Sequence, residues 1–228
     1  MKYAAYAATR NLYEDLETSL KSLLINSDVD IVYLLIEDDE FPMYLPKECK
    51  IINVANQEFF KPDCPNITKR WTYMSLMRMV IYKLLPKKVD KVLVLDCDTI
   101  VDKNINEIWD IDLGDNYFAG CKEPAKSQYK PYYNAGVLIQ NLKLLRSSGM
   151  GDKIVDLINT KAFGATEQDA MNSLCADKIL AISPKYNKSN WTEVPFEIKI
   201  RHFAHEDNWR EDPLVSKYKI IDWSRIFR

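Results

Sequence analysis

Glycine is scarce in this sequence, with only six residues in 228. Neither G-x-G-x-x-G nor G-x-x-x-x-G-K-[S/T] occurs, and a backbone cradle for phosphate groups needs glycines at such spacings. A Gly-rich dinucleotide site and P-loop chemistry are therefore not expected.

Paired cysteines and surplus positive charge are also missing. The five cysteines are scattered singly, without a C-x-x-C pair, which fits neither a disulfide framework nor a thiolate zinc site. A reducing compartment, the cytoplasm, is the expected location. Thirty-one basic residues against 33 acidic ones give a net charge of −2, so no basic field for nucleic acid is expected.

Long apolar runs are absent as well. The weakly apolar start ends at Thr9-Arg10, too short for a signal peptide, and is expected to be a buried strand. Nothing approaches the roughly 18 apolar residues of a membrane helix. The length and the ordinary composition predict one domain, residues 1–228, with a nucleotide-binding-like half of about 1–100 and an irregular half of about 101–228.

Strand and helix patterns alternate in the first hundred residues. We expect strands at 2–8, 31–36, 51–54 and 91–95, and helices at about 12–27 and 71–85. Asn11 is expected to be the N-cap of the first helix. Beyond residue 100, short strands at 117–120 and 136–139 and helices near 151–160 and 167–176 are expected. The alternation predicts an α/β fold around a mainly parallel central sheet flanked by helices.

The strongest chemical signal is Asp96-Cys97-Asp98, directly after the strand expected at 91–95. Ligands of open α/β sheets bind beyond the carboxyl ends of the strands. Because side chains alternate along extended backbone, Asp96 and Asp98 turn to one side and can bind one divalent cation. Cys97 turns away and is expected to be a small buried residue rather than a thiolate ligand.

The same residues permit a second interpretation, an aspartyl-phosphate phosphatase. Residues 92–99 also fit an apolar strand followed by D-x-D-x-T, with Asp96 as nucleophile and Asp98 as acid or base. That motif usually lies near the N-terminus, whereas ninety-five residues precede it here. The late acidic pair Glu206-Asp207 follows no plain apolar strand, as such a phosphatase would need.

Three further segments follow in order: Y-N-A-G-V at 133–137, E-Q-D-A-M-N at 167–172 and R-H-F at 201–203. Together with the strand and D-x-D they resemble glycosyltransferase family 8, the family of glycogenin and of the bacterial galactosyl- and glucosyltransferases that build lipopolysaccharide. The resemblance runs from Tyr3 to about Trp209. It implies a nucleotide-sugar-binding fold of the GT-A type, with the acceptor on the side of residues 101–228.

The resemblance implies a metal site formed by Asp96, Asp98 and His202, usually for Mn²⁺. A set of two carboxylates and one imidazole suits Mn²⁺, with Mg²⁺ as the alternative. The second histidine, His205, is expected within a turn of His202. Which histidine binds the metal stays open, and the other is expected near the diphosphate.

The resemblance also implies where a donor binds. The residues that match the nucleotide segment are Ala8, Thr9 and Asn11, with Leu12 or Tyr13 beside the base and with Cys97 and Asp98 near the diphosphate. The residues that match the donor-sugar end are Arg78, Asn134, Ala135, Glu167 and Gln168. Among these, Arg78, Glu167 and Gln168 are the catalytic candidates. Plainer alternatives are a surface arginine for Arg78, a simple turn at 134–136 and a helix cap for Gln168.

One departure from the family pattern concerns the diphosphate. The family usually continues H-x-x-G-x-x-K-P-W, whereas residues 202–209 read HFAHEDNW and lack that glycine and lysine. An acidic pair thus stands where a cation would neutralise the leaving group, unless His205, Arg201 or Arg210 substitutes.

The implied activity is metal-dependent, retaining transfer of a hexose, glucose or galactose by default, from a UDP-sugar to a hydroxyl of a glycan or glycoconjugate acceptor. The missing lysine suggests another alternative, a nucleotide-sugar-binding domain without catalysis. Neither a nucleic-acid partner nor an integral membrane segment is expected, and the sequence does not indicate an oligomeric state.

Overall fold

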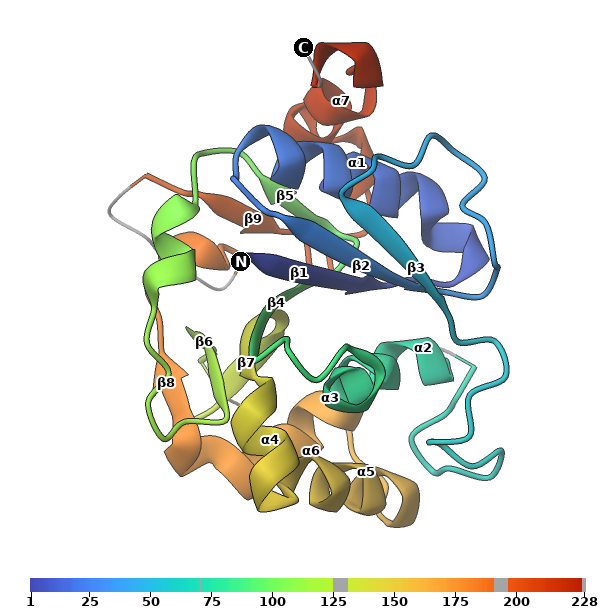
Figure 1. The fold of residues 1–228 in the computed structure, drawn as a ribbon, viewed down its shortest axis with the longest axis vertical. Coiled ribbons are helices and arrows are strands. Elements are labelled where there is room, and N and C mark those ends of the chain that lie inside the picture. The colour runs from blue at the N-terminus through green and yellow to red at the C-terminus, as the bar shows by residue number, and fades with distance from the viewer. Residues whose placement is uncertain (70, 125–130, 191–196, 227–228) are drawn as a thin grey trace.

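A computed structural model describes residues 1–69, 71–124, 131–190 and 197–226. One sheet has the strand order β3-β2-β1-β4-β7-β6-β8, and a smaller sheet pairs β5 with β9 (Figure 1). The strands are β1 (Tyr3–Ala7), β2 (Ile31–Ile36), β3 (Cys49–Asn53), β4 (Lys91–Leu95), β5 (Thr99–Val101), β6 (Phe118–Lys122), β7 (Tyr133–Asn141), β8 (Ile179–Ala181) and β9 (Ile200–His202).

The large sheet is mainly parallel, as the alternating pattern predicts. β1 pairs in parallel with β2 and β4, β2 with β3, and β6 with β8. β7 runs antiparallel to both of its neighbours, β4 and β6. Because β7 is reversed, its N-terminal end lies beside the carboxyl end of β4, and this arrangement brings residues 134–136 to the Asp96-Cys97-Asp98 turn.

Helices cover both faces of this sheet. They are α1 (Tyr13–Ile25), α2 (Tyr73–Leu76), α3 (Ile81–Leu84), α4 (Leu142–Ser148), α5 (Met150–Thr160), α6 (Thr166–Cys175) and α7 (Pro213–Lys219). Figure 1 shows α1 on one face and α3 to α6 on the other. Side chains of β4 alternate between the two resulting cores: Val92 and Val94 face α3 to α6, whereas Leu93 and Leu95 face α1.

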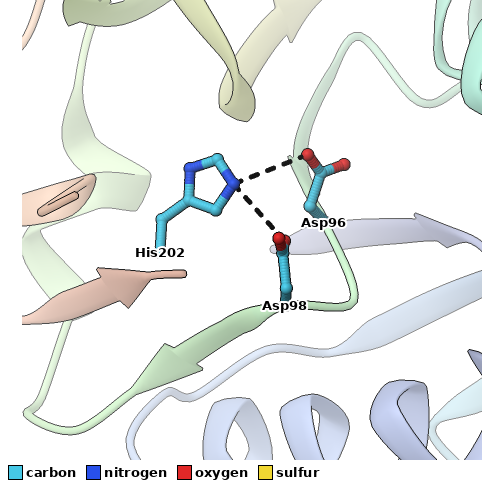
Figure 2. Close-up of side chains that lie close together, drawn as sticks. All are labelled: Asp96, Asp98 and His202. Atoms are coloured by element: carbon cyan, nitrogen blue, oxygen red, sulfur yellow. Dashed lines mark ion pairs between the residues drawn. The ribbon is translucent and has the colours of Figure 1, made fainter. Parts of the chain in front are cut away.

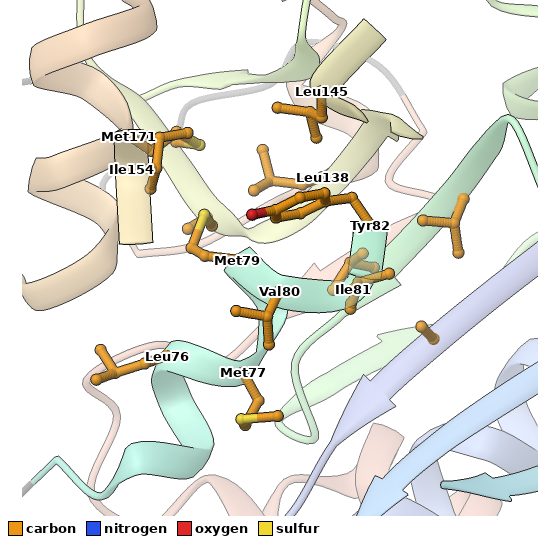
Figure 3. Close-up of a cluster of buried hydrophobic side chains, with 14 of the residues drawn as sticks. Leu76, Met77, Met79, Val80, Ile81, Tyr82, Leu138, Leu145, Ile154 and Met171 are labelled. Atoms are coloured by element: carbon orange, nitrogen blue, oxygen red, sulfur yellow. The ribbon is translucent and has the colours of Figure 1, made fainter. Parts of the chain in front are cut away.

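The core between β7 and the helices α3 to α6 is closely packed. Side chains of the segment Leu76–Tyr82 meet Leu138 of β7 and residues of α4, α5 and α6, as Figure 3 shows. The helix expected at 71–85 is therefore present, but a 3₁₀ segment, Met77–Val80, separates α2 from α3. It ends before Pro86, which cannot continue a helix.

Two local expectations are wrong. Asn11 does not cap α1: it lies inside the 3₁₀ turn Arg10–Leu12, and the residue before α1 is Leu12, which makes no side-chain cap. The segment 134–136 is not a turn before a strand, because β7 already begins at Tyr133. Its alternating side chains therefore point to defined sides of the sheet.

Several elements lack a sequence pattern strong enough to predict them, among them β5, β8, β9, α4 and α7. All five cysteines are buried and unpaired. Within the described ranges, no helix combines the length and apolar character that crossing a membrane requires. The single-domain organisation and the cytoplasmic location stay predictions.

Candidate metal centre

Asp96 and Asp98 lie in the short turn between β4 and β5. The Asp96 amide donates to the carbonyl of Gly136 at 2.9 Å, and the carbonyl of Asp98 accepts from the Phe203 amide at 3.0 Å. The turn is thus held by β7 on one side and by the end of β9 on the other. Cys97 is buried beside β1, as expected.

His202 reaches this turn through the small sheet. β9 pairs antiparallel with β5 in a register that sets Thr99 opposite His202. The imidazole Nε2 lies 3.3 Å from Oδ1 of Asp98 and 3.8 Å from Oδ2 of Asp96 (Figure 2). One ligand atom from each of the three residues lies within 4.8 Å of the others. This is the group that the resemblance implies, and it contains His202 rather than His205.

Gly136 makes room for this imidazole. A Cβ atom at Gly136 would lie only 2.1 Å from Cε1 of His202, far inside van der Waals contact. On its other edge the ring places Nδ1 at 2.8 Å from Oδ1 of Asn187. His202 is 3% exposed. The imidazole is therefore held between β7 and the segment that follows Pro184–Tyr186.

Asp96, Asp98 and His202 are called the metal group below, and Arg78 joins this group to α6. Its guanidinium pairs with Asp96, lies 3.3 Å from Oε1 of Glu167 and donates to the carbonyl of Ala135 at 2.7 Å. Burial opposes its charge, yet the carboxylates of Asp96 and Glu167 raise the pKa of Arg78 above its ordinary value. The plain alternative of a surface arginine is therefore wrong.

The charges of the site are coupled. Burial alone would lower the pKa of His202, but Asp98 and Asp96 raise it above its ordinary value. Burial opposes the charge of Asp98 in the same way, and His202 lowers the pKa of this carboxyl nevertheless. Burial raises the pKa of Glu167, with Arg78 acting against that rise. The carboxylates thus stabilise positive charge in their midst, a setting that also favours a divalent cation.

Two cavities meet at the metal group, and both are lined by Arg78, Asp96 and Asp98. The first, the β7–α6 pocket, has a volume of about 340 Å³. Its further lining includes Glu123, Asn134, Ala135, Glu167, Gln168, His202 and His205. The second, the β1 groove, has a volume of about 560 Å³. Its further lining includes Thr9, Asn11, Leu12, Lys69, Cys97, Trp209 and Arg210.

In the β7–α6 pocket, Gln168 is bonded at both ends of its amide. Its Oε1 accepts from the Ala135 amide at 2.8 Å, and its Nε2 donates to the hydroxyl of Tyr132 at 2.9 Å and to Oε2 of Glu123 at 3.2 Å. Gln168 does not cap α6, because Asp169 accepts from the amide of Ala165, the residue before the helix. The helix-cap alternative for Gln168 is therefore wrong.

The β1 groove receives only some of the residues expected at the nucleotide. Thr9 and Asn11 line it, and the hydroxyl of Thr9 donates to Oδ1 of Asn11 at 2.6 Å. Ala8 is fully buried. Of the two candidates beside a base, Leu12 lines the groove, whereas Tyr13 packs on Phe41 and donates to Asp38.

Within the described part of the C-terminal segment, the cation that lines the β1 groove is Arg210. Arg201 is turned into the protein, where it pairs with Glu206 and donates to two backbone carbonyls. Arg210 lines the groove, pairs with Asp15 at 2.6 Å and lies over the ring of Trp209. His205 lines the other cavity.

Glu123 and Asn187 also belong to the site, although no sequence motif predicts them. Glu123 accepts from both Asn134 and Gln168 and lines the β7–α6 pocket. Asn187 contacts the imidazole of His202. Neither stands in a recognisable motif: Asn187 is visible only as the start of an Asn-Lys-Ser triplet, and Glu123 only as a lone acid after β6.

Comparison with known proteins agrees with this geometry. Residues 4–193 match the model of the family described as glycosyl transferase family 8. Glycosyltransferase GlyE of Streptococcus pneumoniae serotype 4 is 28% identical over 247 residues, an alignment that covers 92% of this chain and 59% of GlyE. This chain therefore spans about three fifths of the length of that relative.

Solved structures show the same fold. The apo form of GlyE from S. pneumoniae TIGR4 superimposes with a TM-score of 0.77 at 21% identity, covering 99% of this chain and 61% of that chain. The galactosyltransferase LgtC, in complex with donor and acceptor sugar analogs, gives a TM-score of 0.69 at 18% identity and covers 97% and 98%. These likenesses confirm the GT-A fold, and the match over most of the sequence shows that the chain belongs to glycosyl transferase family 8.

Proposed function

We propose that this chain is a metal-dependent, retaining glycosyltransferase that moves a hexose from a UDP-sugar to a hydroxyl of a glycan or glycoconjugate acceptor. The observation that carries the proposal is the group of Asp96, Asp98 and His202 at the boundary between two cavities. A relative with this fold, LgtC, has been solved with donor and acceptor sugar analogs. Glucose and galactose are the default donor sugars.

The donor atoms of this group fit Mn²⁺. Two carboxylates and one imidazole offer mixed oxygen and nitrogen ligands, which Mn²⁺ accepts more readily than Mg²⁺, a cation that prefers oxygen alone. Asp96, Asp98 and His202 would hold the ion. When bound, it supplies a Lewis acid for the diphosphate leaving group.

The β7–α6 pocket would take the hexose. Arg78, Asn134, Ala135, Glu167 and Gln168 converge there. An amide is a weak nucleophile, and both ends of the Gln168 amide already hold hydrogen bonds. We therefore favour attack on the face that the leaving group departs from, assisted by a phosphate oxygen, over a double displacement at Gln168.

The β1 groove would take the nucleotide, with Thr9, Asn11 and Leu12 at the uridine and Cys97 near the diphosphate. We assign the role of the missing lysine to Arg210, because it is the C-terminal arginine that lines the groove. The hydrogen bond and charge of Asp15 raise the pKa of Arg210, so it stays cationic. Arg201 is already engaged by Glu206.

Thermal shift against UDP-, GDP- and TDP-sugars, with and without Mn²⁺, tests the proposal. At 100 times its dissociation constant, a ligand adds about 2.7 kcal/mol of stability, which gives a clear shift. We expect stabilisation by UDP-sugars that depends on Mn²⁺, followed by slow hydrolysis when no acceptor is present. An absence of uridine preference contradicts the proposal. Binding without any turnover, in the presence of candidate acceptors, would identify a non-catalytic binding domain instead.

Membership in family 8 leaves the aspartyl-phosphate alternative without support. That alternative predicts no preference for uridine in the thermal-shift panel, and Mg²⁺-dependent release of phosphate from simple phosphate esters. The panel together with a turnover assay therefore separates the three hypotheses.

A further inference from the structure

Asn187 lies directly behind the imidazole of the metal group and is 3% exposed. Its Oδ1 is 2.8 Å from Nδ1 of His202, and its Nδ2 donates to Oδ1 of Asn134 at 2.9 Å. The next residue, Lys188, pairs with the edge of β9: its amide donates to Ile200 at 3.0 Å and its carbonyl accepts from the His202 amide at 2.8 Å. The backbone therefore holds Asn187 beside the ring.

The orientation of two side-chain amides follows from one backbone group. The Gly136 amide can only donate, and it lies 2.9 Å from Oδ1 of Asn134, so that atom must be the carbonyl oxygen. The Asn187 atom that faces the same oxygen must donate, which identifies it as Nδ2. Its Oδ1 consequently faces Nδ1 of His202, and an oxygen in that place requires a proton on Nδ1.

The hydrogen bond between Asn134 and Glu123 supports the same orientation of the Asn134 amide. The Nδ2 of Asn134 lies 3.0 Å from Oε2 of Glu123, a carboxylate oxygen that accepts. The Asn134 amide is thus fixed from both sides, by a donor at its oxygen and by an acceptor at its nitrogen. No alternative amide orientation satisfies both partners.

We propose that Asn187 is a positioning residue that fixes the tautomer of His202. In the neutral ring, a proton on Nδ1 leaves a lone pair on Nε2, which faces Asp96 and Asp98, where a cation can use it. A hydrogen bond to the second ring nitrogen is the usual means of setting both the tautomer and the ring orientation of a metal-binding histidine. The link to metal affinity rests on the proposed function, whereas the tautomer itself does not.

Two substitutions at Asn187 separate positioning from simple structural support. Asn187→Leu removes the acceptor at Nδ1, and we expect it to raise the dissociation constant for Mn²⁺ about 10- to 100-fold. Asn187→Asp keeps an acceptor at Nδ1 but sets two acceptors against each other at Asn134. It should lower the melting temperature while retaining Mn²⁺ affinity. A purely structural residue would lose affinity in both variants alike.

Asn66→Leu is the matched control. Asn66 is also a buried amide, 1% exposed, and it donates to backbone carbonyls of Ile158 and Lys161 away from the metal group. We expect this variant to lose stability and to bind Mn²⁺ as the unmodified protein does.

The readouts are Mn²⁺ affinity, measured on the whole chain without donor, and ¹⁵N chemical shifts of the imidazoles in metal-free protein at alkaline pH. The chain has only two histidines, so a His205→Gln variant assigns the signals. We expect the Nδ1-protonated form at His202 and its loss in Asn187→Leu. A neutral His202 that carries its single proton on Nε2 in the unmodified protein overturns the inference even if Asn187→Leu does not fold.

Unchanged Mn²⁺ affinity in a folded Asn187→Leu variant also overturns the inference, as does an equal loss in Asn187→Asp. A protein that shows the expected variant effects but transfers no sugar contradicts the proposed function and leaves the role of Asn187 standing. The two failures are therefore distinguishable.

Discussion

The β7–α6 pocket and the β1 groove share the metal group but differ in construction. In the pocket, polar side chains bond across elements that are distant in sequence: Gln168 of α6 holds the backbone of β7, and Asn187 holds His202. In the groove, Thr9 bonds Asn11 two residues away, and Asn11 is exposed. The polar side chains of the pocket are thus ordered by tertiary contacts, whereas at the end of the groove that Thr9 and Asn11 line, the hydrogen bond stays within one local turn.

The difference matches what each cavity has to do under the proposed function. Groups that stabilise a transition state act best when they are already fixed, because they then need no reorganisation during the reaction. Groups that only hold a nucleotide can settle when it binds. We therefore expect substitutions in the pocket to affect turnover strongly and those in the groove to affect affinity modestly.

The largest effect is expected from Asp98→Asn, at the junction of the two cavities. The substitution replaces a charged ligand of the metal group by a neutral amide, and Mn²⁺-dependent hydrolysis of the UDP-sugar should be abolished. Circular dichroism should show an intact fold. Asp115→Asn, which changes an exposed acid, is the control. Undiminished turnover in Asp98→Asn would remove the metal centre from the mechanism.

Gln168→Ala should come next and should separate turnover from binding. An interaction made mainly in the transition state lowers kcat and leaves nucleotide affinity almost unchanged. By analogy with a lost oxyanion-hole donor, we expect kcat to fall about 100- to 1,000-fold, which corresponds to about 2.7–4 kcal/mol of transition-state stabilisation. Steady-state kinetics, UDP titration and thermal unfolding of this one variant measure kcat, nucleotide affinity and melting temperature.

The control for Gln168 is Gln57→Ala, since the Gln57 amide bonds the backbone of Phe60 at both ends, outside both cavities. This control should lower the melting temperature only. A lower melting temperature for Gln168→Ala, with kcat per folded molecule unchanged, would reduce Gln168 to a structural residue.

Gly136→Ala should give a smaller effect that combines stability and metal binding. The new methyl group would overlap the imidazole of His202, so ring or strand must shift, at about 1–3 kcal/mol of unfolding free energy. Mn²⁺ affinity should fall with it. Gly164→Ala is the control, because its Cβ would meet only an oxygen of Asp169 at 3.7 Å. Equal Mn²⁺ affinity in both variants contradicts the packing argument.

The smallest effect is expected from Arg210→Ala in the β1 groove. The Arg210 side chain is 53% exposed, and exposed charge pairs contribute roughly 0.2–1 kcal/mol, so UDP should bind only a few-fold more weakly. Calorimetric titration of UDP with Mn²⁺ present measures this change, and Arg210→Lys should recover most of it. Unaltered UDP affinity would show that another group faces the diphosphate.

Local patterns in the sequence determine most of the large sheet and two of the three residues of the metal group. The apolar run at 91–95 forms β4 because its side chains can be buried on both faces. Asp96 and Asp98 follow two residues apart, so one turn directs both carboxylates to the same side. These relations are short-range, and periodicity therefore reveals them.

Family motifs extend the prediction further than periodicity does. They identify five further candidate residues, all of which line the β7–α6 pocket: Arg78, Asn134, Ala135, Glu167 and Gln168. They do not distinguish Leu12 from Tyr13. The backbone makes that choice, because the 3₁₀ turn Arg10–Leu12 precedes α1 and places only Leu12 along the groove.

The remaining part of the site depends on pairing between distant segments. His202 reaches Asp98 because β9 adds to β5, two strands of three residues that are too short to show a period. Asn187 is placed by the backbone of Lys188 along the edge of β9. The β5–β9 register brings His202 to the carboxylates and decides which of its nitrogens faces them. The reversed strand β7 places Gly136 against the ring, where a side chain would not fit. Such contacts join residues up to about a hundred positions apart, and no local propensity encodes them.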